Sequence, residues 1–339
     1  MKQVVLRGPH DIAVVDNGAS AGEQLVAPDH ALVRLRLAGV CGSDLAAFRG
    51  TSPQVSYPRV LGHELLVDVL QAPDRPELVG RRAVVEPLLP CRVCRVCRAG
   101  RYNCCPRLQV LGVHVDGGMQ TEFRVPVGQL YAVPDALDDD TAVLAEPLSI
   151  AYRAVQRAEM AAGETALVFG AGPIGLLIVQ LVMKARGCRA VVVDVDRARL
   201  DLAERVGAIA VRSGAELVDA VSRVTGGEMA AYVFEATGAP ACVRLATDVV
   251  RTTGRIILVG WSHGPVEVDT VALMRKEAEL VGTRNSTGAF GPVLKLLEDG
   301  VVDAETMITH HLEFDGAAEA LHVLDRGEPA LKIVIAGYA

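Results

Sequence analysis

Two patterns of apolar positions divide the sequence. In residues 1 to about 150, segments such as ALVRLRLAGV and RRAVVEP place apolar and polar residues in alternation, and Pro or Gly interrupts them about every ten positions. Alternation with a period of two is typical of half-buried β-strands, and frequent Pro and Gly mark turns. The first part of the chain is therefore predicted to form an irregular, β-rich domain.

From about residue 151 the apolar runs become nearly continuous. The runs ALVFGAG, AVVVDVD, AAYVFEATG and GRIILVG end in Gly or Asp, and helix-like segments such as IGLLIVQLVMKARG and RARLDLAERVG lie between them. Buried parallel strands alternating with crossover helices give this pattern, which predicts an α/β domain with a doubly wound parallel sheet. After about residue 288, PVLKLLEDG and AAEALHVLDRG predict two helices, and ALKIVIAG predicts a final strand.

Length, composition and charge narrow the possible functions. The chain has 339 residues, enough for two domains with separate cores, and half of the residues are hydrophobic. No apolar run reaches the roughly 18 residues that a membrane helix needs, and MKQVVLRGPHD turns polar too early for a signal peptide. The formal net charge of −7 comes without a basic cluster free of cysteines or acids, which argues against nucleic-acid and membrane partners. We therefore expect a cytoplasmic protein with a small-molecule partner.

Five of the eight cysteines fall within fifteen positions. Cys91, Cys94, Cys97 and Cys105 follow the spacing C-x2-C-x2-C-x7-C, and Cys104 is a fifth thiol among them. In a cytosolic chain this density favours thiolates on a metal over disulfides. Four thiolates from one short loop can surround a tetrahedral Zn²⁺ and leave no position for substrate, so the spacing predicts a structural zinc site. Cys104 is the spare thiol, because two adjacent residues cannot readily point at the same ion.

A second group of potential ligands is scattered along the chain. Cys41 lies in GVCGSD, His63 and Glu64 lie in GHE, and Glu146 lies in AEPLSIAYRAV. Taken singly, His63 also fits a hydrogen-bonded core histidine, and Glu146 also fits the first-turn acid of a helix. Together they supply a thiolate, an imidazole and one or two carboxylates, a set that suits a catalytic zinc with an open position for water or substrate.

A glycine-rich segment predicts a dinucleotide site. Gly170, Gly172 and Gly175, with Pro173 and Ile174, match GxGxxG between the strand-like TALVF and a helix. Such a turn lets a pyrophosphate approach the backbone and aims free N–H groups and the helix dipole at its charge. Asp194 ends the next predicted strand, where a carboxylate can accept hydrogen bonds from the adenosine ribose and repel a 2′-phosphate. NAD is therefore favoured over NADP, although the nearby Arg197 and Arg199 weaken this inference.

The motifs together resemble those of the zinc-dependent medium-chain alcohol and polyol dehydrogenases. The resemblance runs through GVCGSD, GHE, the four-cysteine loop, DGGMQTEF, EPLSIAYRAV and GAGPIG, and so covers essentially the whole chain. It implies a GroES-like catalytic domain over residues 1–150 and 289–339 and a Rossmann domain over residues 151–288. Within the family the chain is most similar to the sorbitol, threonine and sugar-acid 5-dehydrogenase group, because it has EPL rather than a cysteine at the third ligand position.

The resemblance implies roles for single residues. Cys41, His63 and Glu146 would hold the catalytic zinc, with Glu64 beside it. Asp44 would orient His63, and Ser43 would bind the substrate hydroxyl and start a proton relay. Many relatives end this relay on a histidine at the position of Ala46, which cannot accept a proton. For the cofactor and the substrate, the resemblance implies that Arg199, Thr237, Val259, Thr283 and Arg284 join the glycine-rich turn in binding NAD and that His114 borders the substrate pocket; His114 fits a loop hydrogen bond equally well.

These observations predict an NAD-dependent enzyme with two Zn²⁺ ions per chain. It would transfer hydride between NAD and a secondary alcohol, and a polyol, sugar acid or amino alcohol is favoured because few aromatic residues accompany the motifs. One alternative is a zinc-free quinone or enoyl reductase of the same fold, which would have no use for the two ligand groups. The other is a non-catalytic protein that senses NADH, which would be expected to have lost ligands. Relatives are dimers or tetramers, so a homodimer or homotetramer is expected.

Overall fold

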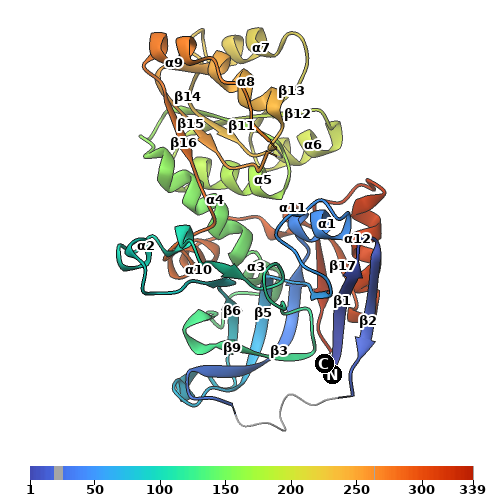
Figure 1. The fold of residues 1–339 in the computed structure, drawn as a ribbon. Coiled ribbons are helices and arrows are strands. Elements are labelled where there is room, and N and C mark those ends of the chain that lie inside the picture. The colour runs from blue at the N-terminus through green and yellow to red at the C-terminus, as the bar shows by residue number, and fades with distance from the viewer. Residues whose placement is uncertain (19–25, 263, 339) are drawn as a thin grey trace. The chain divides into compact units, whose positions relative to one another are not determined.

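The chain forms two units, one built on a mostly antiparallel sheet and the other on a parallel sheet (Figure 1). The computed structural model describes residues 1–18, 26–262 and 264–338. The first unit comprises Met1–Glu146, Phe290–Asp299 and Ile308–Ala339, and the second comprises Pro147–Ala289 and Gly300–Met307. Residues 300–307, which the sequence prediction gave to the first domain, thus pack with the second unit.

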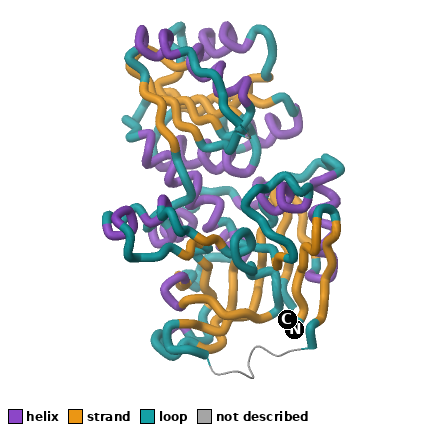
Figure 2. The backbone as a smooth tube through the Cα atoms, in the orientation of Figure 1, coloured by secondary structure: helices purple, strands orange, loops and turns teal. Residues whose placement is uncertain are grey.

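The first unit is built on a seven-stranded sheet with the order β10-β6-β5-β3-β18-β17, in which β9 also pairs with β3. Long loops connect its short strands (Figure 2). The strands of this sheet are β3 (His30–Gly39), β5 (Glu64–Gln71), β6 (Arg82–Val85), β9 (Glu122–Pro126), β10 (Leu130–Ala132), β17 (Ile308–Leu312) and β18 (Lys332–Ala336). Its two smaller sheets contain β1 (Lys2–Gly8), β2 (Asp11–Asp16) and β4 (Arg59–Val60), and β7 (Leu88–Leu89) and β8 (Gln109–Val110).

Strand β3 shows why the alternating sequence forms this sheet. The side chains of Val33 and Leu35 are buried, whereas those of Arg34 and Arg36 between and beyond them are exposed. One face of the strand therefore packs into the core and the other meets water. The helices of this unit are short: α1 (Gly42–Phe48), α2 (Arg95–Arg98), α3 (Asp139–Val143), α10 (Phe290–Glu298) and α12 (Ala317–Asp325). Helix α4 (Ala145–Ala158) begins in this unit and continues in the second.

The second unit contains a six-stranded sheet in which every pair is parallel, with the order β13-β12-β11-β14-β15-β16. Its strands are β11 (Thr165–Phe169), β12 (Arg189–Asp194), β13 (Ile209–Arg212), β14 (Ala230–Glu235), β15 (Val250–Leu258) and β16 (Glu279–Gly282). Helices cover both faces of this sheet (Figure 1): α5 (Pro173–Gln180), α6 (Arg197–Arg205), α7 (Leu217–Val224), α8 (Pro240–Val249) and α9 (Thr270–Lys276). A short α11 (Ala304–Met307) also belongs to this unit. The strand order reverses direction between β11 and β14, which is where such sheets bind nucleotides.

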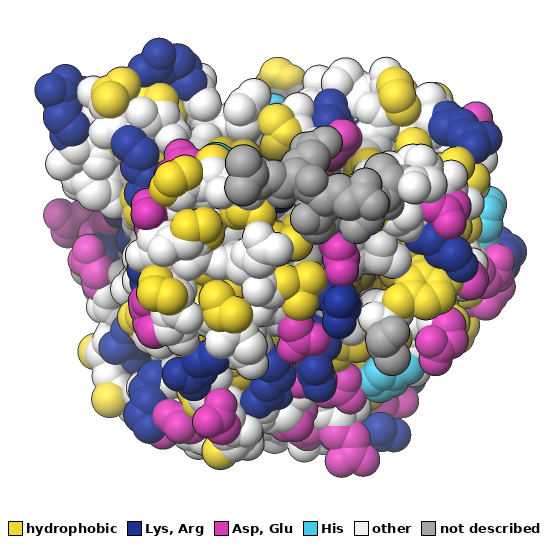
Figure 3. All heavy atoms as spheres, turned by 90° about the horizontal axis from the view of Figure 1, so that it is seen from below, with side chains coloured by type: hydrophobic (Ala, Val, Ile, Leu, Met, Phe, Trp, Pro, Cys, Tyr) yellow, Lys and Arg dark blue, Asp and Glu magenta, His cyan; other side chains and the backbone are white. Residues whose placement is uncertain are grey.

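The surface and the helices agree with the sequence composition. On the face seen in Figure 3, Lys and Arg side chains lie interspersed with Asp and Glu side chains. Within the described ranges, no helix has both the length and the apolar character needed to cross a membrane. The cytoplasmic location stays a prediction.

Candidate active site

Potential ligand atoms of Cys41, His63 and Glu64 converge in the first unit, all within 4.8 Å of one another. Cys41 immediately precedes α1, and His63 and Glu64 lie where β5 begins. Pairing of β3 with β5 places Gly39 opposite Glu64, and a Cβ at Gly39 would lie 2.0 Å from Oε2 of Glu64. The pairing of two strands distant in sequence therefore assembles the cluster, and only glycine leaves room for the carboxylate.

Asp44 and Ser43 flank the ring of His63. Asp44 is buried, accepts the backbone N–H of Cys41 at 3.0 Å, and places Oδ1 3.7 Å from Nδ1 of His63. Ser43 Oγ lies 3.2 Å from Nε2. Burial lowers the pKa of His63, but the negative charges of Asp44 and Cys41 outweigh this effect, so the pKa lies well above its usual value. The surroundings of the ring therefore favour a cation.

Lys332 is a member of this cluster that sequence reasoning missed. Its Nζ lies 2.7 Å from each carboxylate oxygen of Glu64 and donates to the carbonyl of Val40 at 3.1 Å. Both side chains of the ion pair are almost fully buried. Burial lowers the pKa of Lys332, but the negative charges around it, Glu64 first among them, raise that pKa by more than burial lowers it. The pKa of Lys332 is therefore raised overall. The signal in the sequence was a lysine inside the apolar run of the last strand, ALKIVIAG.

Glu146 lies in the first turn of α4 and is 9% exposed. Burial, together with the charges of Glu64 and Asp44, raises its pKa to about 7, although His63 and Lys332 act in the opposite direction. Glu146 thus belongs to the same group of interacting charges, but the set of described residues within 4.8 Å contains Glu64 and not Glu146. The choice of Glu146 as the third zinc ligand remains a prediction.

The sulfur atoms of Cys91, Cys94, Cys97 and Cys105 form the second cluster, again within 4.8 Å of one another. The Cys94 and Cys97 sulfurs are 3.3 Å apart. Cys104 stands outside the group, as the sequence predicted.

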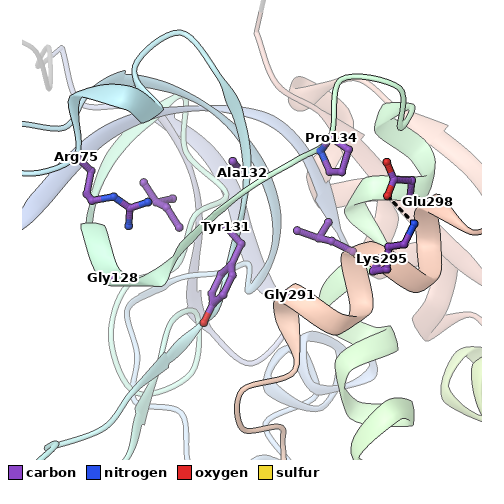
Figure 4. A pocket seen from close by; sticks show the side chains of 10 residues that line it. Arg75, Gly128, Tyr131, Ala132, Pro134, Gly291, Lys295 and Glu298 are labelled. Atoms are coloured by element: carbon purple, nitrogen blue, oxygen red, sulfur yellow. Dashed lines mark hydrogen bonds and ion pairs between the residues drawn. The ribbon is translucent and has the colours of Figure 1, made fainter.

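The four-cysteine loop is joined to the sheet by a buried carboxylate. Glu86 accepts hydrogen bonds from the hydroxyls of Tyr102 at 2.6 Å and Tyr131 at 3.1 Å. The guanidinium of Arg92, from within the loop, lies 4.8 Å from the centre of the Tyr102 ring. Burial raises the pKa of Glu86, although the two hydroxyls lower it. Tyr131 also faces a surface hollow of about 510 Å³ beside α10 (Figure 4), whose lining contains no residue of either ligand cluster.

In the second unit, the glycine-rich turn connects β11 to α5. Gly170 has φ +96°, which favours glycine, and a Cβ at Gly175 would lie 1.9 Å from the carbonyl oxygen of Gly170. Gly172 precedes α5, which begins at Pro173 and continues through Ile174, and a Cβ on Gly172 would meet nothing within 4 Å. The turn is therefore closed on the side of the helix and open at Gly172, the position where a phosphate would approach.

Asp194 ends β12 beside this turn. Its carboxylate accepts the N–H groups of Ala171 at 2.7 Å and Asp196 at 2.9 Å. Arg197 pairs with Asp201 at 2.7 Å and with Glu204, and Arg199 lies 3.8 Å from Asp196. The arginines that weakened the preference for NAD thus have acidic partners on or beside α6.

Three other predicted cofactor residues follow the carboxyl ends of β14, β15 and β16. Glu235, which sequence reasoning missed, is buried and accepts the N–H groups of Thr237 at 2.8 Å and Gly238 at 3.1 Å. The backbone of Val259 donates to the Glu235 carbonyl at 2.9 Å, and Thr283 donates to the Leu258 carbonyl at 3.0 Å. The predicted Arg284 is the next residue along and is exposed.

The chain is similar to known proteins in sequence and in fold. Two family models match: the alcohol dehydrogenase GroES-like domain over residues 27–135 and the zinc-binding dehydrogenase over residues 173–299. L-Galactonate-5-dehydrogenase of Escherichia coli is 36% identical over 86% of this chain and 86% of its own. Sorbitol dehydrogenase 1 of Saccharomyces cerevisiae is 30% identical over 91% of each chain. The crystal structure of the short chain alcohol dehydrogenase RspB of Escherichia coli with NADH has a TM-score of 0.91, at 29% identity, and covers 99% of both chains.

The chain belongs to the zinc-binding alcohol dehydrogenase family. Membership confirms the predicted family, the predicted fold class of a GroES-like domain with a Rossmann domain, and the prediction of an NAD-dependent oxidoreductase that uses zinc. The number of zinc ions and the role of each residue stay predictions.

The residues of this dehydrogenase fit both a bound zinc ion and a bound dinucleotide. At the first cluster, the buried acids Asp44, Glu64 and Glu146 and the Cys41 thiol outnumber the basic side chains of Lys332 and His63, so a divalent cation in place of the His63 proton would balance the negative charge. Thiolate, imidazole and carboxylate are donors that zinc prefers, and four thiols suit a closed zinc site. In the second unit, the open turn at Gly172 offers free space to a phosphate.

His114 has a partner within its own loop. The N–H of Val110 donates to Nδ1 of His114 at 3.2 Å. The geometry accounts for this histidine without a ligand, and its contact with substrate stays a prediction.

Proposed function

We propose that this dehydrogenase oxidises the secondary alcohol of a polyol, a sugar acid or an amino alcohol to a ketone, with NAD as the hydride acceptor. The observation that carries the proposal is the cluster of the half-buried Cys41 with the buried His63 and Glu64, which brings metal-binding atoms together among several acidic groups. The names of two relatives, a sugar-acid dehydrogenase and a sorbitol dehydrogenase, support the substrate class.

Each residue of the cluster has a proposed task. When bound, zinc would acidify the substrate hydroxyl, and NAD would accept the hydride from the carbinol carbon. Cys41 and His63 would hold the metal with Glu146 or Glu64, and Asp44 would keep Nδ1 of His63 protonated and the ring oriented. Ser43, which is exposed and already within hydrogen-bond distance of His63, would receive the hydroxyl proton of the substrate. Because Ala46 offers no base, Ser43 would pass that proton to the cofactor ribose and to water.

An assay with NAD⁺ tests this function. Purified protein is mixed with NAD⁺ and a polyol, a sugar acid or an amino alcohol, and absorbance at 340 nm reports NADH. We expect turnover with at least one class and its loss in His63→Ala, while Cys104→Ser retains it. Reduction of a quinone that survives in His63→Ala, without turnover of any alcohol, would instead favour the zinc-free reductase. Binding of NADH without any turnover would favour the sensor.

We also propose that Asp194 makes the enzyme prefer NAD. Asp194 ends β12 beside the glycine-rich turn, which supports a role in accepting hydrogen bonds from the adenosine ribose. A 2′-phosphate there would meet its negative charge. Asp194→Ala is expected to weaken NAD⁺ and to improve the relative use of NADP⁺, measured as the ratio of kcat/KM values. A wild-type enzyme that prefers NADP⁺ would contradict the proposal.

Finally, we propose a homo-oligomer that assembles through the edge of the parallel sheet. Within the described residues, β16 pairs only with β15 and leaves its other edge open. Leu280 on β16 and Val271 and Met274 on α9 are exposed apolar side chains, with Met274 72% exposed. An open strand edge flanked by apolar side chains is a template for pairing with a second chain.

A further inference from the structure

Trp261 is the only tryptophan of the chain, and it lies 68% exposed. It follows the carboxyl end of β15 by three residues. A single exposed apolar side chain is ordinary on a protein surface, so exposure alone indicates no function. This indole, however, follows the carboxyl end of β15, where the predicted cofactor residues also lie, so its exposure leaves it accessible to a bound cofactor.

The backbone around Trp261 is packed against the loop that follows β14. A Cβ at Gly238 would lie 2.4 Å from the carbonyl oxygen of Trp261, and a Cβ at Gly260 would lie 2.1 Å from the nitrogen of Gly238. Ser262 Oγ donates to the Gly238 carbonyl at 2.8 Å. Trp261 is therefore held beside Thr237 and Gly238 by contacts that only glycine permits.

The buried Glu235 fixes both loops at once. Its carboxylate accepts the N–H groups of Thr237 and Gly238, and its backbone carbonyl accepts those of Val259 at 2.9 Å and Gly260 at 2.8 Å. One residue at the end of β14 thus sets the position of the segment that leads into Trp261. The backbone that carries the indole is therefore fixed by hydrogen bonds.

The strand order decides which half of a dinucleotide would reach this indole. Asp194 ends β12, on one side of β11, and Trp261 follows β15, which lies beyond β14 on the other side. A dinucleotide places its pyrophosphate at the turn after the central strand and its two nucleosides on opposite sides of it. With the adenosine ribose at Asp194, the nicotinamide half extends toward β14 and β15.

We propose that the indole of Trp261 packs against the nicotinamide half of bound NAD and contributes directly to cofactor affinity. The proposal rests on the proposed function, since it takes NAD as the cofactor. Aromatic faces attract flat rings and cations, so the positively charged nicotinamide of NAD⁺ is a better partner than the neutral ring of NADH.

Intrinsic fluorescence tests the contact without any turnover, because Trp261 is the only source of indole emission. The enzyme is titrated with NAD⁺ and, separately, with ADP-ribose, which carries the adenosine and both phosphates but no nicotinamide. NAD⁺ does not absorb at the emission wavelength of tryptophan, and its pyridinium ring quenches an indole only on contact. We expect saturable quenching by NAD⁺ and none by ADP-ribose, although both bind by calorimetry.

Variants separate the contact from a general effect on the site. Trp261→Ala is expected to bind NAD⁺ about tenfold more weakly and ADP-ribose unchanged, while Trp261→Phe keeps most of the affinity. Val195, which is 72% exposed and follows Asp194, provides the control on the adenosine side. Any loss of affinity in Val195→Ala should affect NAD⁺ and ADP-ribose by the same factor.

Equal NAD⁺ affinity in Trp261→Ala and wild type, or equal fluorescence responses to NAD⁺ and ADP-ribose, would overturn the inference while leaving the proposed function intact. Emission that depends on protein concentration and not on NAD⁺ would place the indole at a contact between chains, with the same consequence. Failure of both NAD⁺ and ADP-ribose to bind would overturn the proposed function and this inference together.

Discussion

At the scale of single residues, the pair of Lys332 and Glu64 combines two opposing effects. Nζ of Lys332 lies 2.7 Å from the Glu64 carboxylate, and both side chains are almost fully buried. The attraction between the two charges is therefore strong, and the cost of removing them from water is also high. Removing one partner leaves the other charge buried and unpaired. Lys332→Met is expected to lower the free energy of unfolding by about 3–5 kcal/mol, as measured by urea denaturation.

The double variant Lys332→Met/Glu64→Gln provides the control for this prediction. It removes both charges, so most of the lost stability should return. If Lys332→Met is as stable as the wild type, another cation must balance Glu64. If the double variant is no better than the single one, lost packing rather than an unpaired charge explains the effect.

Glu86 predicts a dependence of stability on pH. Burial raises its pKa above the usual value of about 4.3, which it has in the unfolded chain. The folded state therefore binds the proton of the Glu86 carboxyl group more tightly than the unfolded chain does. The stabilisation that this proton gives the folded state is complete below about pH 4 and is lost as the pH rises through the folded pKa. Glutamine does not titrate. From about pH 4 toward neutrality, the difference in unfolding free energy should therefore shift in favour of Glu86→Gln, as measured by urea denaturation at each pH. A difference that stays constant would mean that the pKa is not raised.

At the scale of elements, the four-cysteine loop is expected to depend on a bound zinc ion for its stability. Residues 91–105 contain only the short α2 and one turn of 3₁₀ helix, so the loop has little hydrogen-bonded structure of its own. Binding energy at a closed thiolate site is folding energy. Cys97→Ser is expected to lose the zinc ion of this loop by elemental analysis and to lose more than about 3 kcal/mol of stability. Cys104→Ser, one position from Cys105, should keep both. Equal zinc contents in the two variants would contradict the structural site.

The same loop shows which features the sequence could predict. Its four cysteines lie close together in the chain, so their spacing alone brings the sulfurs together. The parallel sheet was also predictable, because its strands are buried on both faces and read as continuous apolar runs. Lys332 was not predictable as a partner of Glu64, since the two meet through pairing between strands that are far apart in sequence. The same holds for Glu235, whose carbonyl accepts the N–H groups of Val259 and Gly260 from the loop after the next strand. The assignment of residues 300–307 differed because a short helix takes its unit from packing, which has no local signature.

At the scale of the whole molecule, the open edge of β16 predicts how copies of the chain associate. Leu280 is 41% exposed on that edge. A glutamate at this position would place a charge without a partner in the proposed interface. Leu280→Glu is therefore expected to shift the protein toward the mass of a single chain in light scattering. Val79→Ala changes an exposed apolar residue in the first unit and should leave the mass unchanged. A wild-type protein that is already monomeric would contradict the proposed assembly.

The interruption of the first unit in the sequence sets an order of events during synthesis. Strand β18 completes the sheet of that unit between β3 and β17 and carries Lys332, yet the ribosome makes it after the entire second unit. Because domains fold as units while the chain emerges, the parallel sheet can fold while β3 still lacks its neighbour β18. Until β18 arrives, Glu64 has no buried lysine beside it. The nascent chain is therefore expected to form its glycine-rich turn before the ion pair of Lys332 with Glu64, and a ribosome stalled ahead of residue 332 would carry the first without the second.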